Sequence, residues 1–277
     1  MTTVVAYLSM QGTQYSAVNL ISDSQVSWKD EYGNVVKYKS SQKVFSLHRS
    51  PVMFAYCGKS LFGLNVLSQL TTALDYSSDF VNAQSIEEQS QSVLSALNLA
   101  ALEYSKLSDL EYTQIIHVAR FGVDFFMCEY SYNPTNKNFE HNLINVEPKE
   151  YDDKKLDKVI EVWGSGKKSF DKVYREMVKM NGNFSRVYFR SLVLQLKHQE
   201  DTFSGGVPQM MVLNREGLAS PVGIRYGSKT YLAGAPYLFG VPQDNIEFRD
   251  EYYGFVDLRG KPFSGSRIYS FKDWKPK

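Results

Sequence analysis

Cysteine is scarce in this chain, and the two residues present, Cys57 and Cys128, are too few for a disulfide scaffold or a structural zinc site. We expect both to be reduced residues of the core. The histidines, at positions 48, 117, 141 and 198, are scattered without metal-ligand spacing, so no metal is expected. Residues 164–169 read Gly-Ser-Gly-Lys-Lys-Ser, but a phosphate-binding loop would need Gly at position 161, which is Glu. We therefore expect no cofactor.

Neither sign of charge is in excess, because 31 Lys and Arg residues are balanced by 30 Asp and Glu residues, which leaves a formal charge of +1. Clustered positive charge is what recruits a phosphate backbone, so we expect no nucleic-acid partner. Long apolar runs are missing too, and the chain does not open with a basic region followed by an apolar stretch. We expect no membrane segment, no signal peptide and a cytoplasmic location.

Aromatic residues, by contrast, are abundant: they form 14% of the 277 residues, mainly as 19 Tyr and 17 Phe, and favour packed β-structure. The first part of the chain shows strand-like segments at 4–9, 17–22, 35–38, 43–47 and 52–56. Two amphipathic helices should follow. Leucines at 61, 64, 67, 70 and 74 mark the first, and the second begins after a Ser85 cap and continues to Tyr104.

The second half of the chain repeats this order of elements. Strands are expected at 115–120, 125–130, 143–146 and 159–163, helices at 168–180 and 185–198, and strand-like segments from 208 onward. Because strands and helices come in blocks, the order favours an α+β fold with segregated layers over a parallel βαβ sheet. The simplest division is a domain of residues 1–215 with a β-rich extension, residues 216–277, packed on it.

Thr2, which follows Met1, is a candidate nucleophile only if it becomes the N-terminal residue. A threonine hydroxyl is a weak nucleophile, but a free α-amine on the same residue can serve as its base, since the reference pKa of that amine is about 7.7–8.0. Threonine is small enough for removal of Met1 to be routine. Removal would place nucleophile and base on one residue.

Four short features follow Thr2 in order. They are Asp23-Ser24 at a strand end, Lys43-Val44 at a strand start, Gly164-Ser165-Gly166 at a strand-to-helix junction, and Asp-Thr-Phe-Ser-Gly-Gly at 201–206. Each alone is ordinary for a turn, a strand edge or a helix cap. Together they resemble the proteasome β-subunit family and its bacterial proteasome-like relatives, which are N-terminal-nucleophile hydrolases. The resemblance covers roughly residues 2–215 and implies a four-layer αββα sandwich.

The resemblance assigns a role to each matched residue. Thr2 would attack a carbonyl carbon, Lys43 would place a positive charge beside it, and Asp23 would hold the Lys43 ammonium. The backbone N–H of Gly58 is the expected donor to the oxyanion. A supporting network that orients the Thr2 amine and the catalytic water is expected from Ser165, Asp201 and Ser204.

Two assignments stay open at this level. The segment between Asp23 and Lys43 is longer than in the compact family pattern, so Lys37 and Lys39 compete for the lysine role. We prefer Lys43 because the strand-like residues 44–47 follow it directly. A Ser-His-Asp triad of scattered residues also stays open, although no nucleophile-elbow motif is present.

We expect a threonine hydrolase that, once Met1 is removed, cleaves amide bonds, above all in peptides, through an acyl-enzyme. A small-molecule amidase or acylase on the same fold and a noncatalytic structural subunit that keeps Met1 are the alternatives. The resemblance further implies a homo-oligomeric ring and an ATPase unfoldase partner. Side chains near Val26, Phe45 and Phe54 would line the specificity pocket and admit apolar groups.

Overall fold

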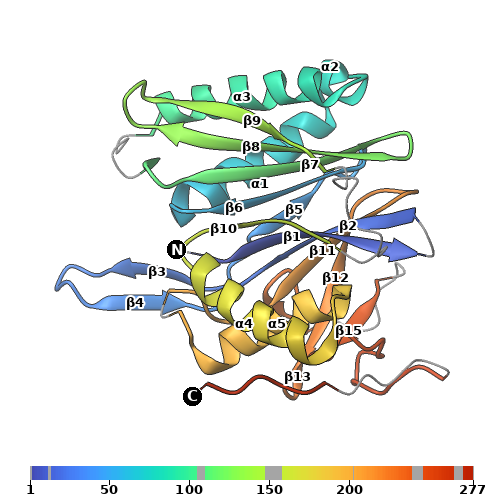
Figure 1. Cartoon of the computed structure of the whole chain (residues 1–277). Helices are drawn as coiled ribbons and strands as arrows, with labels where there is room; N and C mark the ends of the chain where they lie inside the picture. Colours follow the sequence, from blue (N-terminus) through green and yellow to red (C-terminus); the bar gives the residue numbers. More distant parts are fainter. Residues whose placement is uncertain are drawn as a thin grey trace.

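The computed structural model describes residues 2–11, 14–104, 110–146, 158–201, 203–238, 246–264 and 271–276. Two β-sheets lie face to face at its centre, and helices cover the outer side of each (Figure 1). The mixed content of helices and strands confirms the α+β prediction.

The larger sheet has eight strands, in the order β10-β1-β2-β11-β12-β13-β14, with β15 paired to β12 outside this path. Their bounds are β1 (Val4–Gln11), β2 (Gln14–Ser22), β10 (Lys158–Trp163), β11 (Gln209–Asn214), β12 (Ser220–Tyr226), β13 (Lys229–Leu232), β14 (Ala235–Pro236) and β15 (Phe248–Asp250). Antiparallel pairing with β10 on one side and β2 on the other places β1 inside the sheet. The residues that precede β1 are thereby fixed near the middle of the molecule.

The smaller sheet has the order β5-β6-β7-β8-β9. Its strands are β5 (Val44–Ser46), β6 (Val52–Cys57), β7 (Gln114–Phe121), β8 (Asp124–Asn133) and β9 (Asn138–Ile144). A separate hairpin of β3 (Val26–Lys29) and β4 (Val35–Tyr38) projects from the side of the molecule (Figure 1).

In the described part of the chain, five helices cover the sheets. The helices α1 (Ser60–Asp75), α2 (Ser78–Val81) and α3 (Ile86–Leu102) lie on the smaller sheet, and α4 (Lys167–Asn181) and α5 (Ser185–His198) lie on the larger one (Figure 1). The Ser85 side chain accepts a hydrogen bond from Glu88 N, which confirms the predicted cap of α3. The helix α4 ends at the predicted break, where Gly182 has a φ of +83°.

Side chains alternate along β1, so the strand contributes residues to two hydrophobic clusters, one on each face of the larger sheet. Val4, Ala6 and Leu8 point between the two sheets, whereas Val5 and Tyr7 pack in the cluster that contains α5. The strand is therefore buried on both faces, which explains why its sequence is a nearly continuous apolar run.

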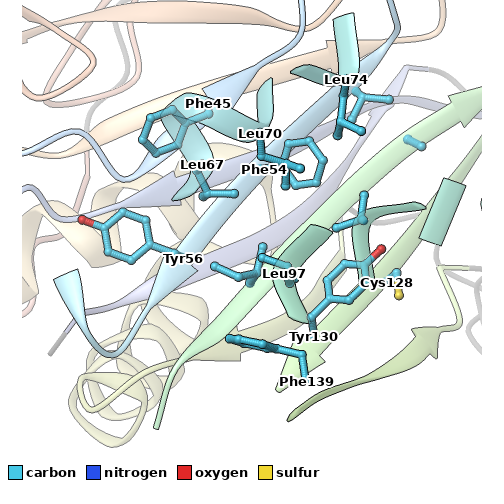
Figure 2. Packing of buried hydrophobic residues seen from close by; sticks show 14 of the residues in the cluster. Phe45, Phe54, Tyr56, Leu67, Leu70, Leu74, Leu97, Cys128, Tyr130 and Phe139 are labelled. Carbon is cyan, nitrogen blue, oxygen red and sulfur yellow. The ribbon is translucent and has the colours of Figure 1, made fainter. Parts of the chain in front are cut away.

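The outer face of the smaller sheet forms the largest cluster of buried side chains (Figure 2). Phe54 and Tyr56 of β6 meet Leu67 of α1 and Leu97 of α3 there, each with 0% exposure. Burying a side chain of this size stabilises a fold by roughly 1.5–3 kcal/mol. These contacts hold the start of α1 against the end of β6.

One strand lies earlier than we predicted. A strand was expected at 143–146, but β9 spans Asn138–Ile144 and pairs with β8 along its whole length. Alternation is weak in this segment because β9 is the edge strand and several of its residues are exposed. Both cysteines are free and buried, as expected. Within the described ranges, no helix combines the length and apolarity needed to cross a membrane.

Candidate functional site

Thr2 and Thr3 lead into β1 and are buried, with exposures of 1% and 0%. Two backbone hydrogen bonds hold this segment. The carbonyl of Thr2 accepts from Gly166 N at 3.4 Å, and the carbonyl of Thr3 accepts from Asp23 N at 3.3 Å. Thr2 is thus anchored between the end of β2 and the start of α4.

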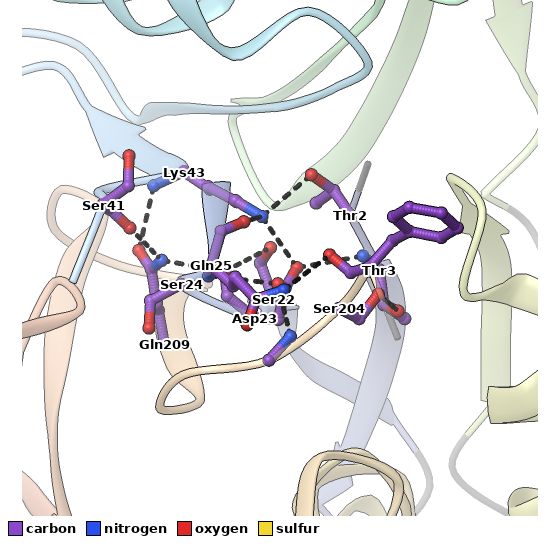
Figure 3. A network of polar contacts seen from close by, with 12 residues as sticks. Thr2, Thr3, Ser22, Asp23, Ser24, Gln25, Ser41, Lys43, Ser204 and Gln209 are labelled. Atoms are coloured by element: carbon purple, nitrogen blue, oxygen red, sulfur yellow. Dashed lines mark hydrogen bonds and ion pairs between the residues drawn. The ribbon is translucent and has the colours of Figure 1, made fainter. Parts of the chain in front are cut away.

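The ammonium group of Lys43, just before β5, points at the Thr2 side chain (Figure 3). Its Nζ lies 2.9 Å from Thr2 Oγ1, 2.9 Å from Asp23 Oδ1 and 2.5 Å from Gln25 O. Lys43 is 0% exposed. Because an ammonium carries three N–H donors, these oxygens match its full donor capacity.

Asp23 is the buried counter-ion of Lys43, and the side chains of both are 0% exposed. Its Oδ1 also accepts from Thr3 N at 3.0 Å, while Oδ2 accepts from Gln25 N at 3.1 Å and Gly205 N at 3.0 Å. A buried ion pair is tolerated only when such hydrogen bonds satisfy its remaining lone pairs. These hydrogen bonds therefore fix the position of the Asp23 carboxylate.

Burial lowers the pKa of the Lys43 ammonium below its ordinary value, and the nearby Asp23 carboxylate acts in the opposite direction. The neutral amine form of Lys43 is consequently easier to reach by loss of a proton than the neutral form of an exposed lysine. Burial also raises the pKa of the Cys57 thiol to about 12, so this thiol stays protonated near neutral pH. Cys57 is therefore unsuited to act as a nucleophile.

A second network begins at Thr3. Its Oγ1 lies 2.8 Å from Ser204 Oγ, which donates to Asp201 Oδ2 at 2.7 Å. Ser165 Oγ reaches the same Asp201 oxygen at a longer 3.4 Å. The structure thus brings Ser165, Asp201 and Ser204 together, as predicted.

The contacts described for this network end on Thr3 Oγ1, whereas we expected it to orient the amine of Thr2. Gln195 of α5 joins the same point, because its Nε2 lies 3.1 Å from Thr3 Oγ1 and 3.1 Å from Gly166 O. Thr3 is therefore part of the site, and Gln195 is a residue that the sequence motifs did not reveal. A glutamine inside the apolar run of residues 192–196 was its only signal.

Two glycines are required where the chain passes Thr2 and Thr3. A Cβ on Gly164 would lie 2.0 Å from Thr2 O, and the φ of this residue is +89°. A Cβ on Gly166 would lie 1.8 Å from Thr3 Oγ1. Real side chains do not approach so closely, so the Gly-Ser-Gly motif lets the start of α4 touch the N-terminal residues.

Gly58 follows β6, at the junction of two surface cavities. One cavity of about 780 Å³ is lined by Gly58, Tyr112, Trp163, Gly164 and Ser165 among others. The other, of about 1000 Å³, also has Gly58 and Tyr112 in its lining. Gly58, the expected oxyanion donor, therefore lines both cavities.

Gln209 of β11 is a further residue that the sequence reasoning missed. Its Oε1 accepts from Lys43 N at 3.0 Å, and its Nε2 donates to Asp23 O at 3.0 Å and Ser41 O at 2.7 Å. The Gln209 amide thus hydrogen-bonds to three separate segments around Lys43. No local sequence motif predicts these contacts. The competing Lys37 is an exposed residue of β4, and Lys39 is also exposed.

The expected specificity pocket is only partly correct. Val26 lines the larger cavity. Phe45 and Phe54 belong instead to the core under α1, with exposures of 6% and 0%, because their side chains point to the outer face of the smaller sheet. Among the described residues, no cluster of three or more His, Cys, Asp or Glu could hold a metal ion.

No protein-family model and no curated protein matches this chain. Solved structures do. Anbu (ancestral beta-subunit) from Yersinia bercovieri aligns over 80% of this chain and 87% of its own, with 12% identity and a TM-score of 0.51. The Anbu complex from Pseudomonas aeruginosa, solved as a helical assembly, aligns over 88% of both chains, with 14% identity and a TM-score of 0.50. Eukaryotic HslV from Trypanosoma brucei aligns over 76% of this chain and 99% of its own, with 18% identity and a TM-score of 0.43.

At these identities the likeness concerns the fold. The two Anbu structures show that this chain has the fold of proteasome-like β-subunits. The resemblance predicted from the sequence motifs is confirmed at that level.

Proposed function

We propose that this protein is an N-terminal threonine hydrolase of the proteasome-like type, which cleaves amide bonds, principally in peptides, once Met1 has been removed. The observation that carries the proposal is the buried chain of contacts from Thr2 Oγ1 through Lys43 Nζ to Asp23 Oδ1, with 2.9 Å at each step. An αββα sandwich of the N-terminal-nucleophile type, with residues 1–215 as the hydrolase domain and 216–277 as its extension, is part of the same proposal.

The proton of the Thr2 hydroxyl has a defined acceptor in this arrangement. A neutral Lys43 amine has two N–H donors, which Asp23 Oδ1 and Gln25 O can both accept, and one lone pair, which then faces Thr2 Oγ1. Burial favours this neutral form. When Lys43 takes the proton, the Asp23 carboxylate stabilises the new ammonium. The free α-amine of Thr2 is a second base for the same proton.

The chemical steps then follow. Thr2 Oγ forms a bond to the substrate carbonyl carbon, and the carbonyl oxygen becomes an oxyanion that the N–H of Gly58 binds. Collapse of this intermediate breaks the C–N bond, and the departing amine takes the proton from the base. The resulting ester is hydrolysed by water, which regenerates the Thr2 hydroxyl. Asp201, Ser165 and Ser204 hold Thr3 and the start of α4 in place during these steps.

A noncatalytic subunit is disfavoured because burying the Lys43–Asp23 ion pair costs desolvation free energy. A lysine and a carboxylate that are both 0% exposed lose their hydration, and an apolar pair of similar volume is often as stable or more so. A purely structural subunit gains nothing from retaining them. We also propose a cytoplasmic homo-oligomeric ring that receives polypeptides from an ATPase unfoldase. Of these features, the homo-oligomer is supported by the Anbu complex, which was solved as a helical assembly.

Intact-mass spectrometry before and after exposure to a peptide vinyl sulfone tests this proposal. We expect the purified protein to lack Met1 and to gain the mass of one probe on Thr2. The Thr2→Ala variant should retain its fold and gain no mass. Thr3→Ser is the matched control, because it keeps the hydroxyl next to Ser204 and should still be labelled. Retention of Met1 together with absence of labelling would refute the enzyme and leave the structural subunit.

A further inference from the structure

The C-terminal extension, residues 216–277, reaches the surroundings of Lys43 through one tight turn between β13 and β14. Only two residues, Ala233 and Gly234, separate the paired strands. Both have a positive φ, of +48° and +83°. Positive φ at both central residues is what a type I′ hairpin turn requires, and alanine adopts it only with strain. Strained backbone persists where the surrounding structure holds it in place.

Gly234 is the buried tip of this turn, whereas the next residue along the chain is exposed. A Cβ added at this position would lie 2.9 Å from Ser41 O, 3.0 Å from Ser24 Cβ and 3.1 Å from Gln209 Nε2. These atoms belong to the segment after β2, the segment before β5 and the start of β11. The β13–β14 turn is therefore packed into the junction of three segments of the proposed hydrolase domain.

Gln209 connects this junction to the Lys43–Asp23 ion pair. Its Oε1 accepts from Lys43 N at 3.0 Å, and its Nε2 donates to Asp23 O at 3.0 Å and to Ser41 O at 2.7 Å. Both N–H donors and the carbonyl of the amide are thus in use. In Figure 3 Gln209 lies on the side of Lys43 that faces away from Thr2. The amide therefore fixes the backbone of both members of the ion pair from behind.

The neighbours of the amide are themselves fixed by hydrogen bonds. Ser41 N donates to Ser24 O at 2.9 Å. Ser24 Oγ donates to Lys39 O at 2.7 Å and accepts from Val207 N at 2.8 Å. The β13–β14 turn covers the same group of residues, and only a glycine at position 234 lets its backbone come so close.

We propose that the β13–β14 turn holds the Gln209 amide in place and that Gln209 is a positioning residue for Lys43, a role that rests on the proposed function. Gln209 acts through the backbone of Lys43, whose Nζ lies 2.9 Å from Thr2 Oγ1. Reacting groups tolerate little displacement, because a misplacement of about 1 Å can slow a reaction by about a hundredfold. The C-terminal extension is by this contact a working part of the site.

The rate at which a peptide vinyl sulfone labels Thr2 tests the turn. Gly234→Ala should lower the maximal labelling rate by about tenfold, because the new Cβ displaces the Gln209 amide. The probe concentration that gives half of the maximal rate should not change, since the turn lines neither cavity. The fraction of protein finally labelled should not change either, because a positioning residue acts on the rate and not on the number of folded sites.

Gly227→Ala is the matched control. Gly227 lies in the β12–β13 turn of the same extension and has a φ of +60°, but it has no atom within 4 Å of its Cβ position. This variant should label at the wild-type rate. Gly234→Asn repeats the test with a residue that tolerates a positive φ, which keeps it decisive if Gly234→Ala does not fold.

Gln209→Met tests the amide itself. Methionine keeps the length of the side chain but makes none of the three hydrogen bonds, so labelling should be at least about tenfold slower. Gln89→Met, at another buried glutamine on α3, should label at the wild-type rate. The double variant of Gly234→Ala with Gln209→Met should be no slower than Gln209→Met alone, because the turn acts through the amide.

Three results would overturn the proposed role of the turn and leave the hydrolase intact. They are equal labelling rates in Gly234→Ala and Gly227→Ala, rate losses that multiply in the double variant, and a smaller labelled fraction at an unchanged rate. The last result would mean that the turn supports folding alone. Absence of labelling in the wild-type protein refutes the proposed function instead.

Discussion

The amine of Lys43 lies 2.9 Å from the hydroxyl of Thr2 and 2.9 Å from the carboxylate of Asp23, and all three residues are at most 1% exposed. The ion pair and the proposed nucleophile are therefore one unit in a medium of low dielectric. Any change to the lysine acts on both stability and chemistry, and the two effects can be separated by choosing the substitution.

Replacing Lys43 by Ala should slow labelling of Thr2 by at least about a hundredfold, because a positioned base is lost. The unfolding free energy should fall by about 3 kcal/mol, because the Asp23 carboxylate stays buried without its counter-ion. Labelling kinetics and urea unfolding measure the two effects. Lys37→Ala, an exposed position on β4, is the control and should match the wild type in both. A larger rate loss in Lys37→Ala would reverse the lysine assignment.

The double variant Lys43→Met with Asp23→Asn separates the two effects of Lys43. A neutral pair removes the unpaired buried charge, so we expect stability to recover in part relative to Lys43→Ala. Recovery stays incomplete because the Asn amide nitrogen cannot accept the backbone N–H groups that the Asp23 carboxylate accepts. Labelling should remain slow because no base faces Thr2. Recovery of labelling together with stability would show that Lys43 has only a structural role.

Gly164→Ala should abolish labelling of Thr2. The added Cβ would lie 2.0 Å from Thr2 O, so the N-terminal segment must move. Gly33→Ala is the matched control, because Gly33 has a similar φ of +81° but no atom within 4 Å of its Cβ position. It should cost about 1–2 kcal/mol through backbone strain alone and keep normal labelling. Equal labelling rates in the two variants would contradict the close contact.

His117 should make the protein sensitive to acid. Its ring is 0% exposed and stacks on Phe54, and burial lowers its pKa from 6.5 to about 3. The unfolded chain therefore binds a proton below pH 6.5 that the folded chain binds only near pH 3. The stability contribution is present above pH 6.5 and is lost as the pH falls toward 3.

Between pH 7.5 and pH 5, linkage predicts a loss of about 2 kcal/mol from this one group. Urea unfolding at the two pH values measures the loss. His117→Phe should show a smaller loss, whereas His48→Gln, at an exposed position, should behave like the wild type. An unchanged acid sensitivity in His117→Phe would assign the effect to another group.

Asp273→Ala should destabilise the attachment of the C-terminal segment. Arg190 of α5 is 2% exposed, and its Nε and Nη2 donate to the two oxygens of Asp273 at 2.9 Å and 2.5 Å. Losing this paired contact should lower the unfolding free energy by about 2–3 kcal/mol, because the buried Arg190 then loses its bidentate counter-ion and keeps the more distant Glu251 carboxylate. Lys179→Ala, which removes an exposed ion pair with Glu176, should change it by less than about 1 kcal/mol. Equal effects would contradict the prediction.

Local sequence motifs predict which residues lie close together around the N-terminal segment. Asp23, Lys43, Ser165, Asp201 and Ser204 converge near the first residues as the resemblance implies. Each occupies a strand end or a helix junction, and such positions are recognisable from apolar periodicity and turn residues.

Contacts between distant segments are what the sequence does not reveal. Gln209 touches Lys43 across 166 residues and Gln195 touches Thr3 across 192, and neither belongs to a local pattern. Phe45 and Phe54 were assigned to a pocket because apolar residues fit a core and a binding wall equally well. Which of these they line depends on the face of the sheet, and that depends on strand register.

Gly205, near the end of the last motif, donates its N–H to Asp23 across 182 residues. Thr3 meets Ser204 across 201 residues. During translation, Thr2 and Lys43 therefore leave the ribosome long before Ser204 and Gly205, which contact the same site, have been synthesised. Under the proposed function, a growing chain carries the Thr2 hydroxyl in an unassembled setting, and the proposed chemistry requires that about three-quarters of the 277 residues have been translated and folded.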